Sequence, residues 1–107
     1  MKLLRSFRGH VHATPKSAYR KLCDELEADG ITILARNDDE RTLAVGGQWW
    51  FHGAWSVVPD GDGARVTLDV STKRPVVAFL ASRAIKRTLT RIEAGWDDDL
   101  ATLAQPL

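Results

Sequence analysis

The sequence contains a single cysteine, Cys23, and no run of apolar residues long enough to cross a membrane. One cysteine cannot form an internal disulfide, which favours a reducing environment over an oxidising one. A membrane-spanning helix needs about 20 consecutive apolar residues, and the apolar stretch at the start of the chain is too short for a signal peptide. We therefore expect a cytoplasmic protein with no transmembrane segment.

Common cofactor and metal motifs are also absent. The sequence has no C-x-x-C or H-E-x-x-H spacing and no phosphate-binding G-x-x-x-x-G-K-[ST] loop. It therefore predicts neither a metal nor a cofactor. The chain also has no marked excess of positive or negative charge, because it contains 15 Lys and Arg and 14 Asp and Glu, for a net charge of +1. That balance gives no overall attraction to nucleic acid, which we do not expect as a partner.

What is present is the composition of one folded domain covering residues 1–107. Hydrophobic residues make up 44% of the chain and charged residues 27%, which is ordinary for a globular protein. At this length the chain supports a single core. No internal repeat or linker marks a boundary within it.

Alternation of apolar and polar residues, with period two, predicts strands at residues 3–13, 48–58 and 65–73. The β-branched and apolar residues 31–36 precede the turn-rich segment 37–40, which predicts a hairpin with 41–45 as the returning strand. Thr14-Pro15 has the form of an N-cap followed by the first helical residue, and Gly30 suits the C-terminal end of that helix. Gly46-Gly47 is interpreted as a hairpin turn in preference to a bulge. The segment 59–63, P-D-G-D-G, predicts a sharp turn.

The strongest periodic pattern predicts a long amphipathic helix over residues 75–104, beginning at Pro75. Gly95 lies inside it and costs about 1 kcal/mol relative to Ala, so it marks the place where the helix could kink or break. The predicted order is strand, helix, four strands, helix. This order defines an α+β domain in which about five antiparallel strands are covered by the terminal helix.

Two parts of the sequence carry a family resemblance: the strand-to-helix segment 11–22, V-H-A-T-P-K-S-A-Y-R-K-L, and the terminal helix with Ile92, Trp96 and Leu100. Together with the element order they resemble the helix-grip superfamily of START, Bet v 1-like and polyketide cyclase-like proteins. The resemblance implies an apolar ligand held between sheet and C-terminal helix, with no fixed catalytic residues. That family usually has seven strands, two more than are predicted here. The segment 51–55, F-H-G-A-W, gives a weaker resemblance to small proteins associated with polyhydroxyalkanoate granules.

Four large aromatic residues fall within seven positions, at Trp49, Trp50, Phe51 and Trp55. Alternation directs all of them except Trp50 inward, either as plain core or as the wall of a ligand pocket. Trp50 is expected to be exposed and to mark an interface. The predicted pocket wall comprises Trp49, Phe51, Trp55, Val70, Leu89 and Trp96.

Between Asp69 and Glu93 the chain has six basic residues and no acidic one. Arg83, Arg87 and Arg91 follow one another at intervals of four, so they form one stripe on the predicted helix. Together with Trp50 they are the predicted partner-binding residues. The alternative is a solvated face that pairs with acidic residues elsewhere.

The histidines His10, His12 and His52 fall on the polar side of their strands, where they could converge if those strands were neighbours. Asp69 is the one carboxylate that could assist them, although strand histidines are more often solvent-facing polar residues. Cys23 is interpreted as a small buried hydrophobe.

The leading hypothesis is a non-enzymatic binding module for a small apolar or aromatic molecule. One alternative is a protein-interaction or assembly subunit, for instance a homodimer. The other is a cyclase-like or dehydratase-like enzyme that uses His52 with Asp69.

Overall fold

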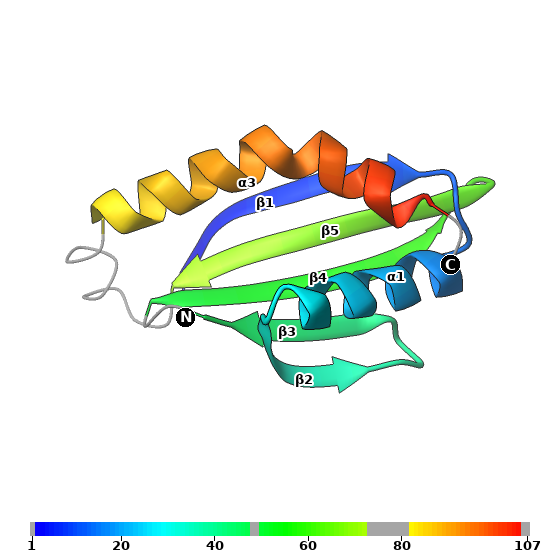
Figure 1. Ribbon diagram of the computed structural model, residues 1–107, viewed down its shortest axis with the longest axis horizontal. Helices are drawn as coiled ribbons and strands as arrows, with labels where there is room; N and C mark the ends of the chain where they lie inside the picture. Colours follow the sequence, from blue (N-terminus) through cyan, green and yellow to red (C-terminus); the bar gives the residue numbers. More distant parts are fainter. Residues whose placement is uncertain (1, 48–49, 73–81, 106–107) are drawn as a thin grey trace.

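The computed structural model describes residues 2–47, 50–72 and 82–105. The elements in chain order are β1 (Lys2–Val11), α1 (Pro15–Ala28), β2 (Thr32–Asn37), β3 (Thr42–Gly46), β4 (Phe51–Asp60), β5 (Gly63–Thr72) and α3 (Ser82–Leu103) (Figure 1). The predicted α+β class and order of elements are confirmed.

The five strands form one antiparallel sheet in the order β1-β5-β4-β3-β2. Its register places Phe7 of β1 opposite Leu68 of β5, Leu68 opposite Trp55 of β4, and Trp55 opposite Leu43 of β3. Residues opposite one another point to the same face of a sheet. These four buried side chains therefore make one apolar row across the sheet.

Both helices cover the face that carries this row. Helix α3 runs along β1, and α1 lies in front of β4 and β3 (Figure 1). In β5, Val66, Leu68 and Val70 are buried as their alternation predicts, while the residues between them are partly exposed. The domain thus has two layers, with the outer face of the sheet toward solvent.

Helix α1 begins as predicted. The Thr14 Oγ1 accepts a hydrogen bond from the Ser17 N–H at 3.1 Å, and Pro15 occupies the first turn, where its missing N–H costs nothing. The buried face of the helix consists of Ala18, Tyr19, Leu22 and Cys23. Cys23 is free and buried, and burial raises the pKa of its thiol, so its reactive thiolate form is disfavoured.

The boundaries of β4 differ from the prediction. The strand begins at Phe51, while Gln48 and Trp49 lie outside the described residues. It extends through Pro59 to Asp60, so only Gly61 and Asp62 remain as the turn to β5, with Gly61 at a positive φ of 62°. Gly46 is the last residue of β3 and pairs with His52, so β3 and β4 form a hairpin and not one strand with a bulge. The tight turn predicted at Gly46-Gly47 was wrong, because Gly46 belongs to the strand.

Helix α3 is continuous from Ser82 to Leu103 and passes through Gly95 without a break. Residues 75–81 of the predicted helix lie outside the described part of the chain. Gly9 of β1 allows α3 to approach closely, because a Cβ at this position would lie 2.2 Å from the Leu100 Cδ1. Among the described residues, no helix is both long enough and apolar enough to cross a membrane.

Candidate functional site

An apolar groove lies between the two helices above the sheet. It has a volume of about 280 Å³. We call it the α1–α3 groove, and its lining residues are Leu26, Ile31, Val45, Gly46, Gly47, Phe51, Trp55, Leu68, Thr88, Ile92 and Asp99. A smaller cavity of about 110 Å³ shares Leu26, Trp55 and Asp99 with the groove. The recess therefore continues along the line where α1 and α3 face each other.

The C-terminal end of α1 places Leu26 and Ile31 at one side of the groove. Gly30 adopts a φ of 74°, and the Ile31 N–H donates to the Leu26 carbonyl at 3.0 Å. A glycine at positive φ followed by this hydrogen bond is the usual way to end a helix and redirect the chain. Ile31 is consequently held against the groove although 40% of it is exposed.

The floor of the groove is formed by the sheet. Trp55 and Leu68 face each other across β4 and β5, and Phe51 lies further along the same face of β4. Gly53 makes this packing possible, because a Cβ there would lie 2.9 Å from the Val45 Cγ2 and 3.2 Å from the Phe51 Cζ. The missing side chain leaves room for the Phe51 ring over the strand.

Among the described residues that line the groove, Asp99 is the one ionisable side chain. The residue keeps contact with solvent, but desolvation, followed by the charges of Asp29 and Asp98, raises the pKa of its carboxyl. Thr88 adds a hydroxyl on the same helix. The groove thus combines a mostly apolar lining with one carboxylate that lacks a nearby cation among the described salt bridges.

The predicted pocket wall is divided by the structure. Phe51 and Trp55 line the groove. Val70 and Trp96 are buried in the core, and Leu89 packs against that core, but none of these three lines the groove. Trp49 lies outside the described residues.

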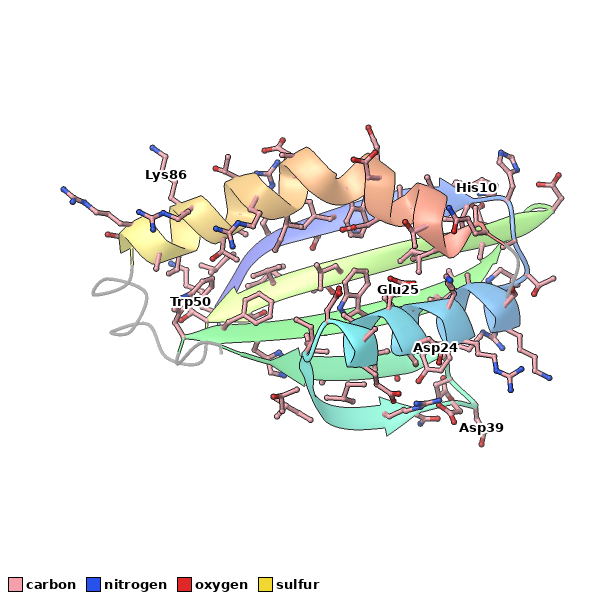
Figure 2. All side chains as sticks on the ribbon, viewed as in Figure 1. His10, Asp24, Glu25, Asp39, Trp50 and Lys86 are labelled. Carbon is pink, nitrogen blue, oxygen red and sulfur yellow. The ribbon has the colours of Figure 1, made fainter. Side chains whose placement is uncertain are left out.

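The expectation that Trp50 is exposed was wrong, because its side chain is completely buried. Strand alternation does not apply to it, since β4 starts one residue later, at Phe51. The Trp50 ring packs edge-on against Phe51, with centroids 5.5 Å apart. Figure 2 places Trp50 at the end of the sheet near the start of α3. It belongs to the core and offers no partner surface.

Arg83, Arg87 and Arg91 are exposed on α3, as predicted, and they share one surface with Lys86, Thr90 and Ala94. None of the ion pairs formed between described residues includes any of these cations. The nearest ion pair on the helix instead joins Glu93 to Arg5 of β1, at 2.8 Å. The three arginines therefore form an exposed basic stripe on α3, and nothing in the described part of the chain covers it.

His52 does not converge with His10 and His12, because β5 separates β1 from β4. His10 lies opposite Arg65 and His52 opposite Ser71, near opposite ends of β5. The Asp69 carboxylate accepts a hydrogen bond from the Ser6 hydroxyl. No hydrogen bond between described residues joins His52 to Asp69, so the structure offers no assembled pair for the enzyme hypothesis.

A polar cluster around Tyr19 was not anticipated. The Tyr19 hydroxyl lies 2.9 Å from the Thr42 carbonyl and 3.1 Å from Asp38, and Arg36 donates to Asp38 at 2.6 Å. Burial, and the nearby Cys23 and Asp38, raise the pKa of Tyr19. The hydroxyl is therefore a hydrogen-bond donor that fastens α1 to β3. The apolar spacing of residues along α1 predicts that Tyr19 is buried, but it gives no sign that the hydroxyl forms these hydrogen bonds.

Comparison with known proteins gives a fold and no family. No family model matches the sequence, and no curated protein matches it. The chain is similar in structure to the protein TTHA0849 from Thermus thermophilus, with a TM-score of 0.62 over 92% of this chain and 94% of that chain. The two sequences are 14% identical over this match, so the likeness concerns the fold alone.

Proposed function

We propose that this protein is a non-enzymatic binding module that holds a small, largely apolar molecule in the α1–α3 groove. The observation that supports this proposal best is the lining of the groove, where Trp55 and Phe51 form the floor and Ile92 of α3 the cover. Small-molecule sites are concave and mostly apolar, with a few polar groups that fix orientation. A volume of about 280 Å³ suits a small aromatic ligand.

Asp99 gives this site its polar selectivity. A ligand N–H or O–H that donates to the carboxylate would offset the cost of keeping that charge partly desolvated. An anionic ligand would be repelled by Asp99 and by the neighbouring Asp29 and Asp98. The proposed ligand is therefore neutral or cationic and carries a hydrogen-bond donor. Because Cys23 is free and buried, a reducing cytoplasmic setting suits the protein.

N-phenyl-1-naphthylamine is a suitable probe, because it is apolar, fluorescent and carries one N–H. We expect its emission to rise on binding, with energy transfer from Trp55. Thr88→Phe fills the groove and should weaken binding at least tenfold. Thr90→Phe makes the same change on the exposed side of α3 and should leave affinity unchanged. Absence of binding, or equal binding by both variants, would rule the proposal out.

The role of Asp99 needs a second comparison. 1-Phenylnaphthalene has a similar shape but no N–H. It should bind several-fold more weakly than the amine to the native protein, and the two probes should bind equally to Asp99→Ala. If the native protein does not distinguish them, the groove binds apolar molecules without the polar selectivity proposed here.

A further inference from the structure

His10 lies at the far end of the sheet from Trp50 (Figure 2), and there it meets a second histidine, His12, and an aspartate, Asp62. His10 lies next to the last residue of β1, His12 directly follows that strand, and Asp62 lies in the turn between β4 and β5. One ligand atom from each residue lies within 4.8 Å of those from the other two, and all three side chains are exposed. We call this group the His10–His12–Asp62 cluster.

The sheet register explains why these residues meet. Val11 pairs with Ala64 and His10 with Arg65, so the end of β1 lies beside the start of β5 and its turn. The rings of His10 and His12 are 4.9 Å apart. They are two positions apart along the chain, which directs both to one side of an extended backbone.

His10 is already oriented by a carboxylate of its own. Its Nδ1 lies 3.1 Å from the Asp60 Oδ2, and Arg65 donates to the other oxygen of Asp60 at 3.5 Å. When the proton of the neutral ring is on Nδ1 and is hydrogen-bonded to Asp60, Nε2 carries the free lone pair that can bind a metal ion. In histidines that bind metals, the N–H of the second ring nitrogen usually donates a hydrogen bond to a carboxylate in this way, which fixes both tautomer and ring orientation.

Gly63 provides the space for this ring. A Cβ at position 63 would lie 2.8 Å from the His10 Nε2 and 2.3 Å from the Val11 carbonyl oxygen. A larger residue would therefore displace the imidazole from its place beside the turn. The cluster thus combines three donor atoms, a carboxylate that orients one of them and a glycine that makes room for it.

We propose that the His10–His12–Asp62 cluster binds a divalent transition-metal ion, with Asp60 as the residue that positions His10. Two imidazoles and one carboxylate favour zinc, nickel, cobalt or copper over calcium and magnesium, which prefer oxygen ligands alone. Three protein donors leave room for water at the remaining positions. Because the ligands are exposed, small rotations of their side chains bring the donors to coordination distance.

The test uses untagged, chelator-treated protein titrated with Zn²⁺ and Ni²⁺ by isothermal calorimetry, and with Co²⁺ by visible absorption. We expect one site per chain. His12→Ala and Asp62→Ala should each weaken binding at least tenfold, and circular dichroism should show them folded, because both residues are exposed. His52→Ala, which removes a histidine from another part of the sheet, is the matched control and should bind as the native protein does.

Asp60→Asn tests the positioning role separately. Loss of a carboxylate behind a metal-bound histidine typically weakens binding about 10- to 100-fold, while the number of sites stays at one. The proposal is overturned if the native protein binds none of the three ions. It is equally overturned if His52→Ala weakens binding as much as His12→Ala does.

Discussion

The indole of Trp96 stacks on the indole of Trp55, with ring centroids 5.7 Å apart and ring planes inclined by 21°. The Trp96 Nε1–H donates to the backbone carbonyl of Arg8 at 3.1 Å, and Phe7 packs against the same ring at 5.6 Å. Trp96 therefore joins α3 to β1 and to β4. The floor of the α1–α3 groove rests on this contact, because Trp55 is shared between the stack and the groove.

Replacing Trp96 should separate its two contributions. Trp96→Phe keeps an aromatic ring but leaves the Arg8 carbonyl without its donor, which should cost about 1–3 kcal/mol in unfolding free energy. Trp96→Ala also removes the stack and should cost about 3–5 kcal/mol. Urea unfolding followed by far-ultraviolet circular dichroism measures both. Equal losses for Phe and Ala would mean that the ring contributes nothing beyond its hydrogen bond.

Two glycine-to-alanine substitutions should change the unfolding free energy in opposite directions. Gly9→Ala places a Cβ 2.2 Å from the Leu100 Cδ1, and the forced shift of that side chain should cost about 1–3 kcal/mol. At Gly95 a Cβ meets nothing within 4 Å, so Gly95→Ala should stabilise helix α3 by about 1 kcal/mol.

The same unfolding experiment tests the cause of the Gly9 effect. In a Leu100→Ala background the clash disappears, so the cost of Gly9→Ala should fall well below its value in the native chain. A cost that does not change in the double variant would place the strain somewhere other than the contact between β1 and α3.

The fold was largely predictable from the sequence because its elements carry local signals. Thr14-Pro15 starts α1, and the alternation of Val66, Leu68 and Val70 marks β5 as half-buried. The apolar periodicity of α3 likewise predicted a helix through Gly95, and the helix forms there despite the low helix propensity of glycine. The prediction that Trp50 is exposed was wrong because the alternation was extended to a residue that precedes β4. A one-residue shift along a strand exchanges the buried face for the exposed one.

The site was less predictable because it depends on which strands are neighbours. Phe51 and Trp55 were identified from their clustering, but Leu26, Ile31 and Asp99 reach the groove only through the packing of α1 against α3. The position of β5 between β1 and β4 separates His52 from His10 and brings Asp60 and Asp62 to His10 instead. Strand order of this kind is not encoded in local periodicity.

Asp99 should make stability fall as the pH rises. Its folded-state pKa lies above the ordinary value of 3.8 because of desolvation and the charges of Asp29 and Asp98. The folded chain therefore holds its proton more tightly than the unfolded chain does, and stability is lost between the ordinary and the raised pKa. Asp99→Asn should be more stable than the native protein at neutral pH, and the difference should shrink as the pH falls through this window.

Thermal unfolding across that pH range measures the Asp99 effect. Asp97→Asn removes the same charge two positions earlier, on the exposed side of α3, and serves as the control. If Asp97→Asn and Asp99→Asn change the pH profile equally, the effect reflects the net charge of the helix end and not the desolvation of Asp99 at the groove.

The basic stripe of α3 should reduce stability at low salt. Arg87 stands four residues from both Arg83 and Arg91, and all three are exposed without an ion pair among the described residues. Each like-charge pair at this spacing costs roughly 0.2–0.5 kcal/mol. Arg87→Glu replaces two repulsions by two attractions and should stabilise the protein by roughly 0.8–2 kcal/mol. Arg87→Gln should give roughly half of that gain.

Salt provides the control for this prediction. In 1 M NaCl the screening length falls to about 3 Å, so the native protein, Arg87→Glu and Arg87→Gln should unfold at nearly the same urea concentration. A gain that persists in high salt would indicate helix propensity or packing as its cause. A gain confined to low salt would show that repulsion among Arg83, Arg87 and Arg91 lowers the stability of the native chain.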